Sequence, residues 1–324
     1  MTLPSRSLSF LDVGHGNSAV LHTERGAAII DAGPGSALLE FLRAEAIEEI
    51  DIVLISHSDK DHIEGLLALL GVVKINKVCL NTDSKKESHL WDDLLYALDC
   101  EPEITFQVGL TSTQTGEFDF DGITIQLLAP SSYFAGKGPG STDRSNRVIT
   151  TNSISAVVRL LVDGSPIAVL MGDIDHVGLE NMTIPSEGIS APILVFPHHG
   201  GLLGTEQQTV DWAKRIIDLV TPDLVVFSIG RGQHGTPRHE VISAIKEQSE
   251  ETRLLCTQLS ENCSSTIPAT DPIHMHDTYS HGRCDRKCCA GTVVIDLENP
   301  ANIFPENMTH QNFISVSAPN ALCA

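Results

Sequence analysis

The chain has 324 residues, of which 41% are hydrophobic, and its mean hydropathy is +0.03. This composition predicts a folded globular protein, and no apolar run approaches the roughly 20 residues that a membrane span needs. The 21 basic and 42 acidic side chains give a net charge of −21, which argues against long-range attraction to a nucleic-acid backbone. The first residues lack an apolar signal core, so we expect a cytoplasmic protein without membrane association.

Apolar runs and helical periodicity alternate along the chain in two halves. In the first half we expect strands at 8–13, 18–23, 27–31, 51–56 and 77–80, and helices at 36–46, 62–71 and 88–98. In the second half we expect strands at 104–108, 123–128, 154–162, 166–171, 192–196 and 223–228, and helices at 175–182, 206–216 and 238–248. Several connections are too short for parallel crossovers, so the pattern predicts two mixed sheets packed face to face with helices outside.

The remaining segments are assigned by composition. Residues 131–150 are rich in Gly and Ser and are expected to form a mobile flap beside the functional pocket. A last strand is expected at 291–297, followed by a polar tail of about 25 residues. We therefore divide the chain into a hydrolase core, 1–255, and a region at 256–324 in which a Cys/His-rich loop, the final strand and the tail pack on that core.

The most informative motif is His-Ser-Asp-Lys-Asp-His at 57–62, which directly follows the apolar segment 51–55. Two imidazoles and two carboxylates thus leave one strand end together, where an α/β protein places its chemistry. Two further motifs follow apolar strands in the same way, Met-Gly-Asp-Ile-Asp at 171–175 and Phe-Pro-His-His-Gly at 196–200. The three strand ends are expected to converge on one acidic, imidazole-rich pocket.

Together with Phe-Leu-Asp-Val-Gly-His-Gly-Asn at 10–17 and Ile-Ile-Asp-Ala-Gly at 29–33, these motifs resemble the metallo-β-lactamase superfamily of metallohydrolases. Asp59 replaces the second histidine of the usual His-x-His-x-Asp-His turn, which is similar to the ComEC-like branch, typified by the nuclease domain of bacterial DNA-uptake channel proteins. The resemblance covers roughly residues 8 to 245. It implies an α/β (α+β) fold, a four-layer αββα sandwich, here with a Cys/His-rich C-terminal insertion.

Residues two apart on an extended turn can face one ion while the next pair faces a second. We therefore expect His57 and Asp59 at one metal and Asp61 and His62 at the other. The resemblance further implies that two divalent ions, zinc or manganese, hold a bridging hydroxide, that Asp173 bridges both ions, and that His198 or His199 completes the second site. Asp59 makes the first site harder and more negative, which shifts its preference toward manganese or magnesium without excluding zinc.

Many superfamily members carry one more histidine before the bridging aspartate, but this chain has none between His89 and His176. We expect Asn152 or Ser153 to face the metals instead, directly or through water. The alternative is that Asn152 is a turn residue at the start of a strand. Asp31 is expected to hydrogen-bond a metal-binding imidazole, with a plain turn cap as the alternative.

Other side chains are candidates for contacts with substrate. His15 stands where the branch usually has Gln, and it is either a substrate contact or a structural histidine. In the loop after the strand 223–228, His234 is preferred over His239 for stabilising a phosphoryl oxygen or protonating a leaving group. Arg231 and Arg147 are expected to bind phosphate through their planar guanidinium groups.

Five of the eight cysteines fall between residues 256 and 289, and histidines lie among them. In a cytosolic chain such clustering favours metal binding over disulfides, although the spacing is not a standard zinc pattern. A structural zinc, unliganded thiols and disulfides all stay open. The candidate zinc ligands are Cys256, Cys263, Cys284, Cys288, Cys289 and His281.

These observations favour a metal-dependent hydrolase, first of all a phosphodiesterase or nuclease in which Asp61 and His62 activate water. Its substrate would be a phosphodiester, either a nucleic acid or a nucleotide. One alternative is a hydrolase of a small ester or lactone on the same metal pair, since fold alone does not settle function. Another is a subunit of a multi-protein defence or DNA-handling system, whose acidic surface docks a basic protein partner.

Overall fold

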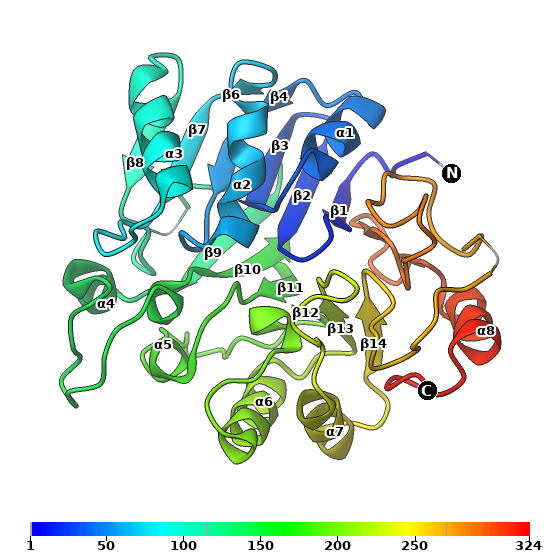
Figure 1. Cartoon of the computed structure of the whole chain (residues 1–324). Helices are drawn as coiled ribbons and strands as arrows, with labels where there is room; N and C mark the ends of the chain where they lie inside the picture. Colours follow the sequence, from blue (N-terminus) through cyan, green and yellow to red (C-terminus); the bar gives the residue numbers. More distant parts are fainter. Residues whose placement is uncertain (1, 115, 270) are drawn as a thin grey trace.

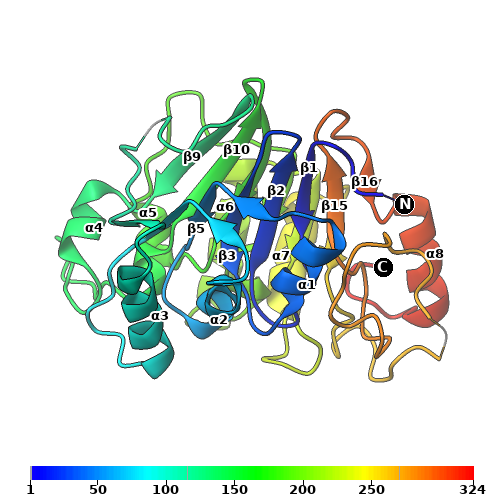
Figure 2. The ribbon, with the colours of Figure 1, turned by 90° about the horizontal axis from the view of Figure 1, so that it is seen from above.

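Two mixed sheets packed face to face lie at the centre of the molecule, and helices cover their outer faces (Figure 1). The computed structural model describes residues 2–114, 116–269 and 271–324. The view from above shows the strands of both sheets running between the helical layers (Figure 2). The predicted four-layer αββα architecture is thereby confirmed.

The first sheet has the strand order β16-β15-β1-β2-β3-β5-β7-β8. Its strands from β16 to β3 pair antiparallel, and those from β3 to β8 pair parallel. The bounds are β1 Ser7–Phe10, β2 Ser18–Thr23, β3 Gly26–Ala32, β5 Ile52–Leu54, β7 Lys77–Leu80, β8 Thr105–Val108, β15 Val293–Asp296 and β16 Ile303–Phe304. A separate small sheet pairs β4 (Glu49–Ile50) with β6 (Lys74–Ile75).

The second sheet has the order β14-β13-β12-β11-β10-β9, antiparallel from β9 to β11 and parallel from β11 to β14. Its bounds are β9 Ile123–Ala129, β10 Val157–Val162, β11 Ser165–Leu170, β12 Ile193–Val195, β13 Leu224–Phe227 and β14 Arg253–Cys256. The parallel strands of both sheets end at the same side of the molecule, so the loops that follow β5, β11, β12 and β13 meet there.

Three apolar layers hold this arrangement together. Because side chains alternate between the faces of a strand, Val158 of β10 lies in the layer between the sheets while Val157 lies under the outer helices. Leu42 and Leu66 belong to the layer that seats α1 and α2 on the first sheet, and Trp212 belongs to the layer that seats α6 on the second. Each sheet is therefore buried on both faces, as its mostly apolar strands require.

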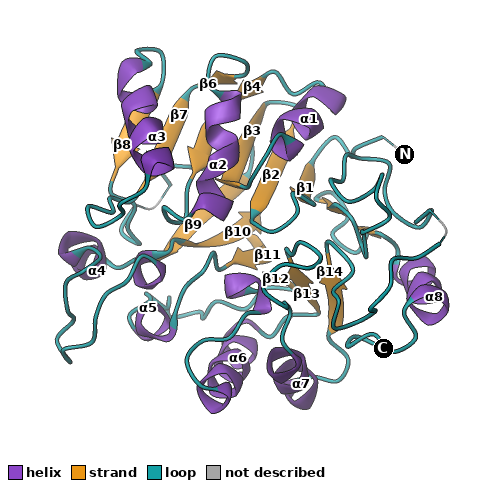
Figure 3. Ribbon diagram, in the orientation of Figure 1, coloured by secondary structure: helices purple, strands orange, loops and turns teal. Residues whose placement is uncertain are grey.

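The helices form the outer layers and the connections between strands (Figure 3). Their bounds are α1 Ala37–Ala44, α2 Lys60–Leu69, α3 His89–Cys100, α4 Ser132–Lys137, α5 His176–Glu180, α6 Glu206–Val220, α7 His239–Gln248 and α8 Asn307–Ser317. Two short 3₁₀ turns are η1 (Asn152–Ile154) and η2 (Pro197–Gly200). Within the described part of the chain, no helix combines the length and the apolar character needed to cross a bilayer.

The C-terminal part differs from its prediction. The expected polar tail forms β16 and α8, and α8 buries His310 and Ile314 against an apolar cluster that includes Cys289. The sequence also missed β14, a four-residue strand that extends the second sheet beside β13. Because β15 pairs with β1, the region after residue 255 contributes strands to the first sheet. The division of the chain into a core, 1–255, and a C-terminal region, 256–324, stays a prediction.

Candidate metal centre

The turn between β5 and α2 supplies four of the expected metal ligands. His57 lies just beyond β5, Asp59 occupies the N-cap position of α2, and Asp61 and His62 lie in the first turn of that helix. An acidic side chain in the first turn also suits the positive end of the helix dipole. The start of α2 therefore carries carboxylate and imidazole groups side by side.

Three more side chains come from the second sheet. Asp173 follows β11, and His198 and His199 lie in η2 after β12. Both histidines have left-handed backbone conformations, with φ of 52° and 54°. Such conformations are costly for residues other than glycine and cluster at functional sites. Here they direct both neighbouring imidazoles toward the acidic side chains, His198 toward Asp173 and His199 toward Asp61.

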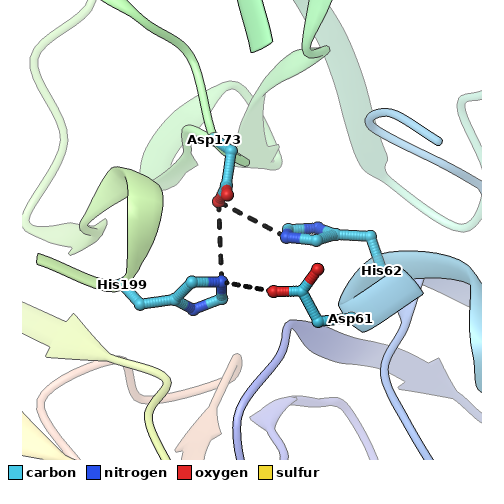
Figure 4. A group of neighbouring side chains, drawn as sticks. All are labelled: Asp61, His62, Asp173 and His199. Carbon is cyan, nitrogen blue, oxygen red and sulfur yellow. Dashed lines mark hydrogen bonds and ion pairs between the residues drawn. The ribbon is translucent and has the colours of Figure 1, made fainter. Parts of the chain in front are cut away.

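Four of these side chains form one tight cluster, Asp61, His62, Asp173 and His199, whose ligand atoms all lie within 4.8 Å of one another (Figure 4). His62 Nε2 lies 3.3 Å from Asp173 Oδ1, and His199 Nε2 lies 3.1 Å from Asp61 Oδ2. The separation between His199 Nε2 and Asp173 Oδ1 is 3.7 Å. The cluster joins α2 of one sheet layer to two loops of the other.

A second group adjoins the other oxygen of Asp173. His57 Nε2 lies 3.9 Å from Asp173 Oδ2 and 3.5 Å from Asp59 Oδ2, and His198 Nδ1 lies 3.0 Å from Asp173 Oδ2. One carboxylate thus faces both groups, with Oδ1 toward the tight cluster and Oδ2 toward the second group. This is the position that the family resemblance implies for a bridging aspartate.

The hydrogen bonds of the ligand atoms test whether a cation fits here. Among the described residues, His57 Nε2, His62 Nε2 and Asp173 Oδ1 are buried polar atoms without a hydrogen-bond partner. Leaving such atoms unpaired costs about 1–3 kcal/mol each. Imidazole nitrogen and carboxylate oxygen together suit zinc and manganese. The cluster therefore supports binding of divalent metal, without distinguishing between these ions.

Neighbouring groups hold the imidazoles in the orientation that a metal needs. His199 Nδ1 lies 2.7 Å from the carbonyl oxygen of Ser228, and this contact fixes the ring with Nε2 toward the cluster. Asp31 Oδ2 lies 2.7 Å from His62 Nδ1, and Asp31 Oδ1 accepts a hydrogen bond from the backbone N–H of Ser56. A carboxylate in this position fixes the tautomer and raises the basicity of the ring.

Ser155 completes the support of the second group, and the sequence did not single it out. Its Oγ accepts a hydrogen bond from the backbone N–H of Asp173 at 3.0 Å and lies 3.4 Å from His57 Nδ1. The prediction had placed Asn152 or Ser153 near the metals. Ser153 instead donates to Asp175, and Asn152 begins η1 and offers its carbonyl oxygen to the backbone N–H of Ser155. Both therefore serve the turn before β10.

The charges within the cluster stabilise one another. Burial by itself would raise the pKa of Asp173, but the charges of His199 and His62 hold that pKa well below its ordinary value. Burial would likewise raise the pKa of Asp61, yet its hydrogen bond with His199 and the charge of His62 lower it. For His62, burial is outweighed by Asp31 and Asp173, which raise its pKa. The carboxylates are ionised at neutral pH and favour a cation among them.

Lys86 is a further contact that the motif spacing does not reveal. It lies in the loop between β7 and α3, and its Nζ forms an ion pair with Asp59 Oδ1. Burial alone would raise the pKa of Asp59, but His57 and Lys86 together lower it to about 2. One oxygen of Asp59 is thus engaged by a lysine while the other faces His57.

The cluster opens into a cavity of about 750 Å³. Beyond the metal-ligand candidates, the cavity is lined by His15, His234 and His281, which come from three different loops. His15 lies between His199 and His234, with ring centroids 4.3 Å and 4.5 Å away. Burial, together with the charge of His199, lowers the pKa of His15 to about 4. His239 begins α7.

The two arginines that were predicted to bind phosphate are engaged elsewhere. Arg147 forms ion pairs with Asp143 at 2.7 Å and with Glu180. Arg231 donates to the carbonyl oxygens of Leu259 and Ser264, at 2.6 Å and 2.8 Å. A guanidinium group satisfied in this way braces the local backbone. The segment 131–150 correspondingly contains α4 and the Arg147 ion pairs, and it does not supply arginine to the cavity.

Only three of the six predicted zinc ligands are brought together in the structure. Cys284 is exposed, the thiol of Cys288 donates to Asp12 at 3.2 Å, and His281 lines the cavity. Cys256, Cys263 and Cys289 share an apolar cluster with Cys323. All eight cysteines are free thiols, and among the described residues no group of three or more of them meets at metal-binding distance.

Residues 11–129 match the family described as Metallo-beta-lactamase superfamily. The chain is also 25% identical over 224 residues to Competence protein ComA of Neisseria gonorrhoeae, which covers 68% of this chain and 26% of that protein. It is 20% identical over 265 residues to ComE operon protein 3 of Bacillus subtilis (strain 168), covering 75% of this chain and 31% of that protein. The chain thus spans about a quarter to a third of the length of these curated relatives.

Among solved structures, the metallo-beta-lactamase fold protein YhfI from Bacillus subtilis matches 78% of this chain and 96% of that chain, with 11% identity and a TM-score of 0.43. The family match and the two competence proteins agree with the motifs at 10–17, 29–33 and 57–62. Residues 11–129 are therefore similar to a metallo-beta-lactamase superfamily domain, and the two competence proteins support similarity to the ComEC-like branch.

Proposed function

We propose that this protein is a metal-dependent hydrolase that cleaves phosphodiesters. One divalent ion would be held by the tight cluster, and a second would lie between Asp173 and the group of His57, Asp59 and His198. The observation that carries the proposal is the set of buried, unpaired ligand atoms of His57, His62 and Asp173. When bound, two such ions lower the pKa of water and neutralise charge that develops on the attacked phosphorus.

The chain's own residues would position the reaction. The hydrogen bond of His199 to Ser228 and the contact of His62 with Asp31 keep both rings from rotating. Preorganised groups of this kind avoid reorganisation during the reaction. The carboxylate of Asp61 is about a quarter exposed toward the cavity, so it can contact both ion and water. His234 is exposed at the rim, where it could donate a proton to a leaving oxygen.

The phosphodiester class is supported by the ComEC-like resemblance and by the cavity's imidazole N–H groups, which suit phosphoryl oxygens. A second candidate, hydrolysis of a small ester or lactone, is favoured by one observation. Among the described residues that line the cavity there is no arginine, and Leu202 and Pro34 add apolar surface. The acidic surface, with a net charge of −21, would suit a basic protein partner in either case.

The test is hydrolysis of bis-p-nitrophenyl phosphate and of a small lactone, each with manganese, zinc or magnesium. We expect metal-stimulated phosphodiester cleavage by the unmodified protein and its loss in the double variant Asp61→Ala, His62→Ala. His89→Ala serves as the control, because His89 is exposed at the start of α3. Lactone hydrolysis without phosphodiester cleavage would favour the second candidate. Undiminished phosphodiester turnover in the double variant would contradict the assigned roles of Asp61 and His62.

A further inference from the structure

Gln258, His281 and Gly282 are held against the loop after β1 by one buried aspartate, Asp12. Asp12 is fully buried, and its Oδ2 accepts a hydrogen bond from the backbone N–H of Gly282 at 2.8 Å. Its Oδ1 accepts from Gln258 Nε2 at 2.9 Å, and its backbone carbonyl accepts from the N–H of His281 at 2.9 Å. Hydrogen bonds to a buried carboxylate are among the stronger ones in proteins. The position of residues 281 and 282 is thus set by the first sheet.

This attachment delivers the side chain of His281 to the wall of the cavity. A Cβ built on Gly14 would lie 3.5 Å from Cδ2 of His281, so the ring rests against the backbone next to His15. The φ of Gly14 is +84°, a conformation in which glycine is favoured. His281 therefore reaches the cavity from a part of the chain that is more than a hundred residues beyond the matched family region, 11–129.

The cavity offers few other donors for an anionic substrate. Lys60 also lines it, but its Nζ lies 3.4 Å from Glu64, which lines the cavity as well. Arg147 and Arg231 are engaged in their own contacts. Beyond the metal-ligand candidates and Lys60, the side-chain N–H donors of the described lining are therefore Gln233 and the rings of His15, His234 and His281.

We infer that His281 is a substrate-binding residue and that, with His15 and His234, it selects a compact phosphodiester of nucleotide or dinucleotide size. This inference rests on the proposed phosphodiesterase function. A long nucleic acid is held through many phosphate contacts along a basic groove. This chain has a net charge of −21, and its cavity of about 750 Å³ lies within the range of small-molecule pockets. A few imidazole donors suit one phosphodiester group better than a polymer.

The experiment compares kinetics on thymidine 5′-(p-nitrophenyl phosphate) and on a single-stranded oligonucleotide of about 20 residues, with manganese. His281→Ala should raise KM for the small substrate about tenfold, the value of one hydrogen bond to a charged group, and should change kcat little. His281→Gln keeps an N–H donor, so its KM for the small substrate should lie between the KM of the unmodified protein and that of His281→Ala. His239→Ala is the matched control, since His239 is also exposed but begins α7, and it should leave KM within about twofold.

The side chain of His281 is exposed, so its replacement should leave the unfolding temperature unchanged and its effect readable. An unchanged KM in His281→Ala would overturn the inference, as would a higher kcat/KM for the oligonucleotide than for the small substrate. If the unmodified protein cleaves neither, calorimetric binding of a dinucleoside phosphorothioate decides. Binding that His281→Ala loses and His239→Ala keeps would support the inference while the hydrolase proposal fails, and absence of binding would overturn the inference as well.

Discussion

Two regions of this protein are rich in potential metal ligands, and they differ in how those ligands are arranged. At the strand ends, the ligand atoms of Asp61, His62, Asp173 and His199 meet within 4.8 Å. In the C-terminal part, the thiols of four cysteines lie in an apolar cluster with side chains such as Leu259 and Ile314. Burial raises the pKa of these thiols, to about 11 for Cys323, so they stay protonated at neutral pH as long as no metal is bound.

The comparison shows that residue type and local density do not by themselves identify a metal site. The strand-end ligands are oriented by groups behind them, such as Asp31 and the carbonyl of Ser228, and several of their inward-facing atoms are unpaired. The cysteines pack as small apolar residues instead. A metal site is recognised by convergence of oriented lone pairs from separate segments.

The largest effect should come from removing the carboxylate that faces both ligand groups. Asp173→Ala should lower metal-stimulated phosphodiester cleavage about a thousandfold, because the ions supply several kcal/mol of charge stabilisation. Elemental analysis should show that its metal content also falls. The control is Asp175→Asn, which changes a buried aspartate two residues away that caps α5. Equal metal content in Asp173→Ala and the unmodified protein would contradict the assignment of the site.

A smaller loss should follow from changing the group behind a ligand. Asp31→Asn keeps the size of the side chain but removes the negative charge beside His62 Nδ1. We expect metal affinity or turnover to fall about 10- to 100-fold, which is typical for such partners of metal-binding histidines. Metal titration followed by activity measures this effect, and a change below twofold would show that Asp31 only caps its turn.

The C-terminal region should respond to pH rather than to metal. Burial, with His274 and Arg253 nearby, lowers the pKa of His310 to about 3, and its Nε2 lies 3.3 Å from Cys289 Sγ. The folded state keeps this ring neutral, while the unfolded chain protonates it near pH 6.5. The free energy of unfolding should therefore fall as the pH drops from 6.5 toward 3, by up to about 1.4 kcal/mol per pH unit.

Urea unfolding at pH 7.5 and pH 5 measures this effect. His310→Gln cannot titrate, so its stability should depend less on pH across this interval. The same pH dependence in the variant and in the unmodified protein would show that other groups control acid stability. The metal content of the variant should equal that of the unmodified protein, because His310 lies away from the strand-end cluster.

Arg147→Ala should change neither the stability of the protein nor its phosphodiester turnover by much. Its ion pairs with Asp143 and Glu180 are partly exposed, and such pairs contribute about 0–1 kcal/mol. Phosphodiester turnover should stay within about twofold of the unmodified protein. A loss of phosphodiester cleavage of more than tenfold would instead support the prediction that Arg147 binds phosphate.

The double variant Cys256→Ser, Cys284→Ser should have the smallest effect of all. We expect its metal content to equal that of the unmodified protein. These two residues belong to the predicted zinc set, but Cys256 is half-buried against the thiol cluster and Cys284 is exposed. Elemental analysis of the unmodified protein should find at most two ions per chain. A third ion that this double variant loses would show that the C-terminal region does bind zinc.

Much of the fold could be predicted because its elements are local patterns. The strand at 18–23 is observed with the same bounds, and the helix expected at 206–216 begins at Glu206, where Thr205 and Gln208 form a capping box. The helix α8 was missed because its hydrophobic face is short and interrupted by polar residues. It is stabilised by what covers it, including the cluster around Cys289 and Ile314.

The sequence by itself determined the alternating strands and helices, the position of the acidic and imidazole residues at the strand ends, and the resemblance to a metallohydrolase family. These follow from periodicity and from spacing within short segments. Only the tertiary structure decided that His199 joins the tight cluster, that Ser155 and Lys86 support the neighbouring group, and that His281 reaches the cavity. It also decided that Arg231 donates to backbone carbonyl oxygens and that Cys323 packs beside the other thiols. The physical reason is that these contacts join segments far apart along the chain, and packing and hydrogen bonding choose among many partners that local sequence leaves equally open.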